Sequence, residues 1–193
     1  MLRVLLSAII GAAVVFGCGY VAWEVLDIHG KLESQQMLPT DGEQKLLEGA
    51  AGQAGVYVFP DTSGMSEEAE KKAYAEGPSG VLFLAVGGRE KMSPMMLVWY
   101  GVACLGAALF ASILVGMSRM GNYFARLVFV LLLGVFTSIV AFLPVWLWHG
   151  APLKWVLANA AEVTGTWYVA GLFIAAIAPW PKKKKDDSID VKL

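Results

Sequence analysis

Charged and reactive side chains are scarce in this sequence. Asp, Glu, Lys and Arg make up 16% of its 193 residues, against about 25% in an average soluble domain. The chain has two cysteines, Cys18 and Cys104, and both lie in apolar runs. We therefore expect buried free thiols and not a disulfide-stapled fold. The net charge of −1 also argues against a nucleic-acid partner.

The motifs of common enzyme classes are missing as well. The sequence contains no HExxH, no GxxxxGK[ST] and no CxxC. Ser7, Ser112 and Ser138 lie within apolar runs, where a role in helix packing explains them better than a role as nucleophiles. We therefore expect that the protein is not an enzyme, and the sequence indicates no particular cofactor.

Apolar residues are abundant, at 57%, and they form four long runs. A helix needs roughly 20 apolar residues to cross a bilayer. The fold class predicted is an all-α membrane protein with a four-transmembrane-helix bundle, whose spans cover residues 1–25, 94–117, 127–148 and 152–180. The fourth range contains Lys154 and Glu162, so we expect it to enter through an interfacial stretch before it crosses.

The first run permits a second interpretation. Arg3, an apolar stretch and Cys18 also fit a lipoprotein signal. Against this, Phe16 is bulky where small residues are usual, and residues 19–23 continue the apolar run beyond the cysteine. An uncleaved first span is therefore the favoured interpretation.

Basic residues set the predicted orientation, because Lys and Arg near the ends of spans favour the cytoplasmic side. One side carries Arg3, Arg119, Arg126 and the basic tail 181–193, which opens with four lysines. The other side carries the long segment 26–93, which is rich in Asp and Glu. Tryptophans near the ends of the runs agree with these boundaries. We expect both termini in the cytoplasm and residues 26–93 outside it.

Residues 26–93 are predicted to form a small α+β extracytoplasmic insertion between spans one and two. A capping-box pattern at Thr40 predicts a helix to about Ala50. GVYVFP (55–60) predicts a strand, and residues 66–76 predict a helix with acids first and lysines later. A second apolar strand follows over 80–86. A linker is the alternative, but it would leave the apolar strands exposed.

Small residues at four-residue spacing predict close contacts between helices. The sets are Ser7 with Gly11, Ala13 with Gly17, Ala103 with Ala107 and Ala111, and Gly171 with Ala175. They suit a tight four-helix bundle, and they suit equally the docking of another chain.

The candidate binding site consists of polar residues near the outer ends of the spans. His29 and His149 are the two histidines, and Glu24 and Glu162 lie near the same level. Two imidazoles with a carboxylate could bind a transition metal, and two imidazoles could hold a haem. The alternative is ordinary polarity at a membrane interface, with no ligand.

Several segments carry a resemblance. GVYVFP (55–60), Gly77-Pro78 before an apolar strand, RLVFVLLLGVF (126–136) and LPVWLWHGAP (143–152) resemble a group of uncharacterised small bacterial inner-membrane proteins with four spans. The resemblance covers most of the chain. It implies a location in the bacterial inner membrane and assigns no active residues.

The leading functional hypothesis is a non-enzymatic accessory or scaffold subunit of a larger membrane complex. Its expected partners are the lipid bilayer and other membrane protein subunits. The runner-up is a membrane-anchored protein that binds metal or haem through the outer polar residues. A small-solute transporter is the third class, although the sequence shows neither two similar halves nor broken helices.

Overall fold

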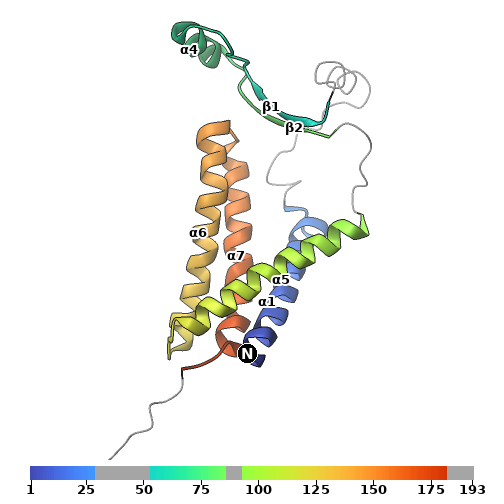
Figure 1. Cartoon of the computed structure of the whole chain (residues 1–193), viewed down its shortest axis with the longest axis vertical. Coiled ribbons are helices and arrows are strands. Elements are labelled where there is room, and N and C mark those ends of the chain that lie inside the picture. Colours follow the sequence, from blue (N-terminus) through green and yellow to red (C-terminus); the bar gives the residue numbers. More distant parts are fainter. Residues whose placement is uncertain (29–52, 86–92, 182–193) are drawn as a thin grey trace, which may run out of the picture.

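The computed structural model describes residues 1–28, 53–85 and 93–181. Its long helices are α1 (Leu2–Tyr20), which a π-helical turn η1 (Val21–Val25) extends, α5 (Pro94–Met117), α6 (Tyr123–His149) and α7 (Leu153–Ile177). Between η1 and α5 lie β1 (Gly55–Phe59), α4 (Glu67–Glu76) and β2 (Gly80–Leu84) (Figure 1).

The four long helices have the length and composition that a membrane span requires. They contain 24 to 27 residues each, with α1 and η1 counted together. At 1.5 Å per residue they are about 36–40 Å long, against about 30 Å for the hydrocarbon core of a bilayer. Only 17–33% of their most apolar stretches is buried inside the protein. Most of their apolar side chains therefore face outward, as in a multi-pass membrane protein, and the predicted four candidate spans are confirmed.

Short polar residues fix where the helices begin and end. The Ser93 hydroxyl accepts a hydrogen bond from the Met96 amide (3.3 Å), and Pro94 occupies the first turn of α5. The Asn122 side chain accepts from the Phe124 amide (2.8 Å) and starts α6. Gly150, with a φ of +67°, ends that helix.

Helix α7 is one uninterrupted helix. Pro152 caps it, and it continues from Leu153 to Ile177. The interfacial stretch and the crossing helix that the sequence predicts are therefore a single element. Helix α6 begins at Tyr123, one turn before the predicted 127, because its cap at Asn122 admits Arg126 into the helix.

Helix α1 lies between α5 and α7, and α7 pairs in turn with α6 (Figure 1). The N-terminus, the turn from α5 to α6 and the end of α7 share one end of the molecule, and the β-ribbon lies beyond the other end (Figure 1). The buried core where these helices meet includes Val15, Ala108, Val115, Val130 and Ile174.

The small residues do pack, but not all of those predicted. Ser7, Gly11, Gly171 and Ala175 are buried, as expected. On α5, however, the buried positions are Cys104, Ala108, Ala111, Ser112 and Val115, whereas Ala103 and Ala107 are exposed. The prediction is right for Ala111 and wrong for Ala103 and Ala107, which lie on the neighbouring helical face, because small residues occur at four-residue spacing on both faces.

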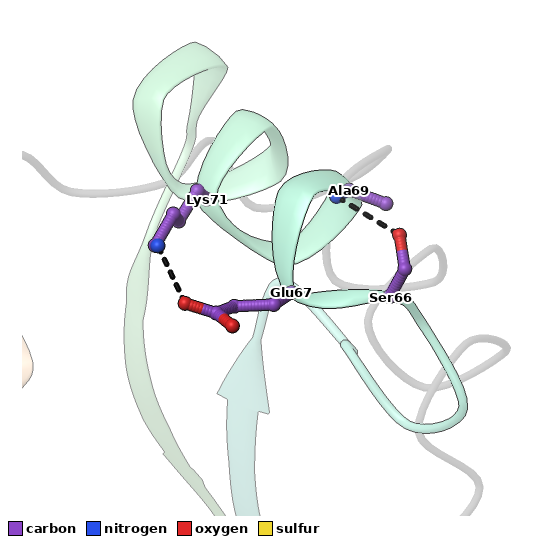
Figure 2. Close-up of polar contacts among 4 residues, drawn as sticks. All are labelled: Ser66, Glu67, Ala69 and Lys71. Atoms are coloured by element: carbon purple, nitrogen blue, oxygen red, sulfur yellow. Dashed lines mark hydrogen bonds and ion pairs between the residues drawn. The ribbon is translucent and has the colours of Figure 1, made fainter.

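The insertion between α1 and α5 contains the predicted strands and its second helix. β1 and β2 pair antiparallel, with Gly55 opposite Leu84 and Phe59 opposite Gly80. The Ser66 hydroxyl accepts a hydrogen bond from the Ala69 amide (3.4 Å), and Lys71 pairs with Glu67 (2.6 Å), so the first turns of α4 are held from both sides (Figure 2). The helix expected over residues 40–50 lies outside the described residues.

Candidate functional site

A groove separates α1 from α7 over part of their length. The two helices touch where a Cβ added to Gly11 would lie 2.8 Å from the Ile174 Cδ1 atom. Farther along, a Cβ added to Gly17 on α1 or to Gly165 on α7 would meet no atom within 4 Å. The resulting α1–α7 groove has a volume of about 500 Å³, and its lining includes Val14, Gly17, Cys18, Ala22, Glu162, Gly165, Thr166 and Phe173.

Glu162 supplies the carboxylate of this groove. It is the tenth residue of α7 and is half-buried, which places it about 14 Å along the axis from Leu153. It shares the groove with Val14 and Cys18, which lie inside α1 and before the π-helical turn. The same groove extends to Leu26 and Ile28, so Glu162 faces a space between α1 and α7 that reaches beyond the π-helical turn. A carboxylate in such a place is costly, and it often marks a functional contact.

The other polar groups of the groove come from the same helical face. Thr166 follows Glu162 by one turn, Gly165 lies beside it, and the Cys18 thiol faces them from α1. The spacing of 162, 165, 166 and 169 places these residues of α7 on one side of the helix. This spacing is visible in the sequence, and the prediction that the stretch lies at a membrane interface stays a prediction.

Polar contacts on the opposite side hold α7 against α6. The Ser138 hydroxyl lies 3.0 Å from the Ala160 carbonyl oxygen and 3.1 Å from the Thr164 hydroxyl. A Cβ added to Gly134 would lie 2.7 Å from the Trp167 Cβ, so the two helices are in close contact here. One face of α7 is thus fixed on α6, which leaves Glu162 and Thr166 directed to the groove.

The end of α7 is held by Arg126, a fully buried residue of α6. Its Nη1 donates to the Ala175 carbonyl oxygen (2.8 Å), and its Nη2 donates to those of Ala178 (2.9 Å) and Pro179 (2.8 Å). Its Cζ atom also lies 4.4 Å from the centroid of the Trp180 ring. Carbonyl oxygens at a helix end lack hydrogen-bond donors within the helix, and the guanidinium of Arg126 supplies these donors. From the sequence alone, Arg126 is recognisable only as a basic residue that favours the cytoplasmic side.

The residues predicted to bind metal are distributed over three places. Glu162 lines the α1–α7 groove, whereas Glu24 belongs to η1 and lines a separate cavity between α1 and α5. His149 is the exposed last residue of α6. Within residues 1–28, 53–85 and 93–181, no three His, Cys, Asp or Glu side chains gather as metal ligands. His29 lies outside the described residues, so the metal site of His29, His149, Glu24 and Glu162 stays a prediction.

Comparison with known proteins adds no relative: no family model, no curated protein and no solved structure matches the chain. The function is therefore argued from the groove and its chemistry.

Proposed function

We propose that this chain is a non-enzymatic accessory subunit of a larger membrane protein complex. Its α1–α7 groove receives a transmembrane helix of a different subunit, and a basic side chain of that helix pairs with Glu162. The observation that carries the proposal is a half-buried carboxylate in a groove whose two walls each present a glycine.

The glycines suit the approach of another helix. Helices in lipid associate through close backbone contact at small residues, because lipid tails are as apolar as leucine side chains. Gly17 and Gly165 lie on opposite walls, and neither has a side chain packed over it. A partner helix can therefore come nearer to α1 and α7 here than at Gly11, where Ile174 already occupies the space.

The charge of Glu162 specifies the chemistry of that helix. Ionisable groups inside membranes pair with each other or with polar backbone groups. A Lys or Arg at matching depth would place a positive charge beside Glu162 in the groove, and Thr166 would add a hydroxyl one turn away. The partner helix is thus an apolar segment that carries one basic residue.

A second copy of this chain fits the groove poorly. Its four candidate spans contain the basic residues Arg3, Arg126 and Lys154. Arg3 and Lys154 lie within two residues of a helix start, and Arg126 already binds the end of α7. Since none of these side chains is available near the middle of a helix, a different subunit is the better occupant.

The proposal places the chain in the bacterial inner membrane with both termini in the cytoplasm. Arg3 and Arg119 belong to chain segments at one end of the helices, where α7 also ends (Figure 1), and the sequence continues after Pro181 with four lysines. The acidic helix α4 belongs to the insertion beyond the other end (Figure 1). Basic residues favour the cytoplasmic side, which gives the orientation.

Site-specific photocrosslinking in native membranes tests the groove. A photoreactive amino acid at Thr166 should crosslink to one membrane protein, through an apolar segment that contains Lys or Arg. The same probe at Phe136, an exposed residue of α6, is the control and should not label that segment. Glu162→Lys should abolish the crosslink, whereas Glu162→Gln should weaken it.

A charge exchange makes the test specific. If the basic residue of the partner is changed to Glu, Glu162→Lys in this chain should restore the crosslink. Labelling of lipid alone from position 166, equal labelling of the partner from position 136, or a crosslink that Glu162→Lys leaves intact would each contradict the proposal.

A further inference from the structure

A second cavity lies on the other side of α1, between its outer part and the start of α5. Its volume is about 410 Å³, within the range of about 300–1,000 Å³ of small-molecule sites. The lining residues are Phe16, Gly19, Tyr20, Trp23, Glu24, Met96, Leu97 and Tyr100. Half of these eight residues are aromatic, and one is a carboxylate. We call this space the aromatic cavity.

The local structure of α1 brings the rings together. Phe16, Tyr20 and Trp23 are spaced by four and three residues, so they lie on one side of the helix. The turn that carries Trp23 and Glu24 is π-helical, with the Leu26 amide bonded to the Val21 carbonyl oxygen at 2.8 Å. Such turns are rare and occur frequently at functional sites.

Helix α5 supplies the opposite wall. The ring centroids of Phe16 and Tyr100 are 5.4 Å apart, with the ring planes tilted by 41°. A Cβ added to Gly19 would collide with the Tyr100 hydroxyl and lie 3.3 Å from its Cζ atom. The glycine therefore lets this ring approach the backbone of α1.

The cavity is open at its rim. Tyr20 and Trp23 are 51% and 52% exposed, so parts of both side chains are accessible from outside. Glu24 is exposed beside them. Among the described residues that line the cavity, Glu24 is the one carboxylate, and no Lys or Arg is present. A ligand would thus meet aromatic side chains and a negative charge together.

Aromatic faces attract positive charge, and they attract it best when the cation is partly removed from water. A carboxylate at the rim adds to the same preference, while the apolar walls favour a ligand with a hydrocarbon body. We propose that the aromatic cavity binds an alkylammonium ion, that is, a positively charged nitrogen on an apolar body. Neither Glu162 nor the α1–α7 groove takes part.

Two sources supply this chemistry. The first is a membrane lipid with an ammonium headgroup, which the position of Trp23 near the end of a candidate span would allow. The second is a free organic cation from the adjacent aqueous side. Either ligand would place its nitrogen against the rings and Glu24. The binding chemistry is therefore the same for both, and the experiment must distinguish the lipid from the free cation.

The full-length chain in nanodiscs of phosphatidylglycerol is titrated with radiolabelled benzyltrimethylammonium. We expect saturable binding of one ion per chain, which the neutral isostere with carbon in place of nitrogen displaces at least tenfold less effectively. Trp23→Leu should weaken binding by about twofold to thirtyfold, the range of one cation–π contact. Glu24→Gln should weaken it by about fivefold, as for an exposed ion pair.

Matched variants guard against general effects. Trp99→Leu removes an exposed tryptophan of α5 that does not line the cavity, and Glu162→Gln removes the carboxylate of the other site. Both should bind the probe as the unchanged protein does. Equal displacement by ion and isostere, equal effects of Trp23→Leu and Trp99→Leu, or no saturable binding would each overturn the proposal.

The lipid arm repeats the titration in nanodiscs of phosphatidylcholine. If the lipid headgroup is the natural occupant, probe affinity should fall at least tenfold in this lipid, and Trp23→Leu should remove the difference between lipids. If a free cation is the occupant, the two lipids should give the same probe affinity. Either outcome supports an ammonium site and identifies its source.

Discussion

At the level of single residues, the end of α7 depends on Arg126. Its planar guanidinium donates to three carbonyl oxygens that follow one another around the last turn, those of Ala175, Ala178 and Pro179. A lysine ammonium has its donors at one point and lacks this spread. The Trp180 ring lies against the same guanidinium. The two helix ends are therefore joined by one side chain.

Replacement of Arg126 by leucine should destabilise the protein strongly. Two buried carbonyl oxygens and a partly buried one would lose their donors, and we expect the free energy of unfolding to fall by about 3–5 kcal/mol. Arg126→Lys should recover part of the loss. Thermal melting in detergent is the measurement, with Arg119→Leu at an exposed arginine as the control. Similar melting temperatures for the two leucine variants would contradict this role.

Asp61, in the turn between β1 and α4, titrates below its usual range. A hydrogen bond with the Ser63 side chain is the main cause of the lowered pKa, and the Ser63 backbone amide, 3.0 Å from Oδ1, adds to it. The ionised carboxylate is therefore favoured in the folded turn. Its stabilising effect is complete above the ordinary pKa of aspartate and is lost as the pH falls through the lowered value.

Ser63→Ala should raise the pKa of Asp61 part of the way toward its ordinary value. The hydroxyl is lost while the backbone amide remains, so the turn keeps one of its two hydrogen bonds. The carbon chemical shift of the Asp61 carboxyl group, followed against pH by NMR, measures the change. Ser79→Ala, in the turn before β2, should leave the pKa of Asp61 unchanged. An unaltered titration in Ser63→Ala would show that the hydroxyl is not the cause.

At the level of elements, α6 and α7 form the closest helix pair. Gly134 admits Trp167, and Gly171 lies where a Cβ would be 3.2 Å from Leu127 and Val130 atoms. The Ser138 hydroxyl bridges to Ala160 and Thr164 about one turn beyond the Gly134 contact. Three interlocking points along the pair leave little freedom for α7 to slide, and this fixes the wall of the α1–α7 groove.

Gly134→Ala should weaken this pair. The added methyl group would meet the Trp167 Cβ, which cannot move without its backbone. We expect the free energy of unfolding to fall by about 1–3 kcal/mol, the usual cost of overpacking. Gly106→Ala on α5, where a Cβ meets no atom within 4 Å, should be neutral or stabilising by up to about 1 kcal/mol. Chemical unfolding of both variants measures their free energies of unfolding. Equal values for Gly134→Ala and Gly106→Ala would contradict the close contact.

The helices were predictable because each is a long run of apolar residues with a recognisable start. Pro94 after Ser93 marks the first turn of α5, and Pro152 marks the cap of α7. The buried face of α5 was harder to predict from the sequence. Ala103 and Cys104 are adjacent, and each is followed four positions later by another small residue. Only the position of α1 decides which of the two faces is buried.

The candidate sites were predictable only in part. Glu162 is visible in the sequence as a carboxylate near an apolar run, but its groove exists because α1 and α7 diverge beyond Gly11. The aromatic cavity depends on a π-helical turn and on the approach of Tyr100 to Gly19. Arg126 is buried because the end of α7 lies beside it. Each feature arises from contacts between distant segments, which local patterns do not contain.

At the level of the whole molecule, charged and aromatic residues are unevenly distributed along the helix axes. Six of the seven tryptophans lie near helix ends, whereas Trp167 lies within α7 and packs on Gly134. Arg3 and Arg119 lie in segments at one end, and the acidic residues of α4 belong to the other (Figure 1). This polarity along one axis is the pattern of a protein with a fixed orientation in a bilayer.

Reporter fusions to the full-length chain test that orientation in a bacterial host. A fluorescent protein that matures only in the cytoplasm should be bright at either terminus. Alkaline phosphatase, active only outside the cytoplasm, should be inactive at the C-terminus and active when inserted after Gly64 in the exposed turn before α4. The opposite pattern at any of the three positions would refute the orientation.

The bonds of Arg126 also constrain how the chain is assembled during synthesis. Residue 126 leaves the ribosome about fifty residues before Ala175 and Pro179, so for that interval its guanidinium has none of these acceptors. We therefore expect α6 to reach its final stability only after the last turn of α7 has been synthesised. Chains that stop after Tyr168 should accordingly be degraded faster in pulse-chase experiments than chains that stop after Pro181. The stretch from Ala175 to Pro179 is therefore the last part of the chain that Arg126 needs before its side chain has all three acceptors.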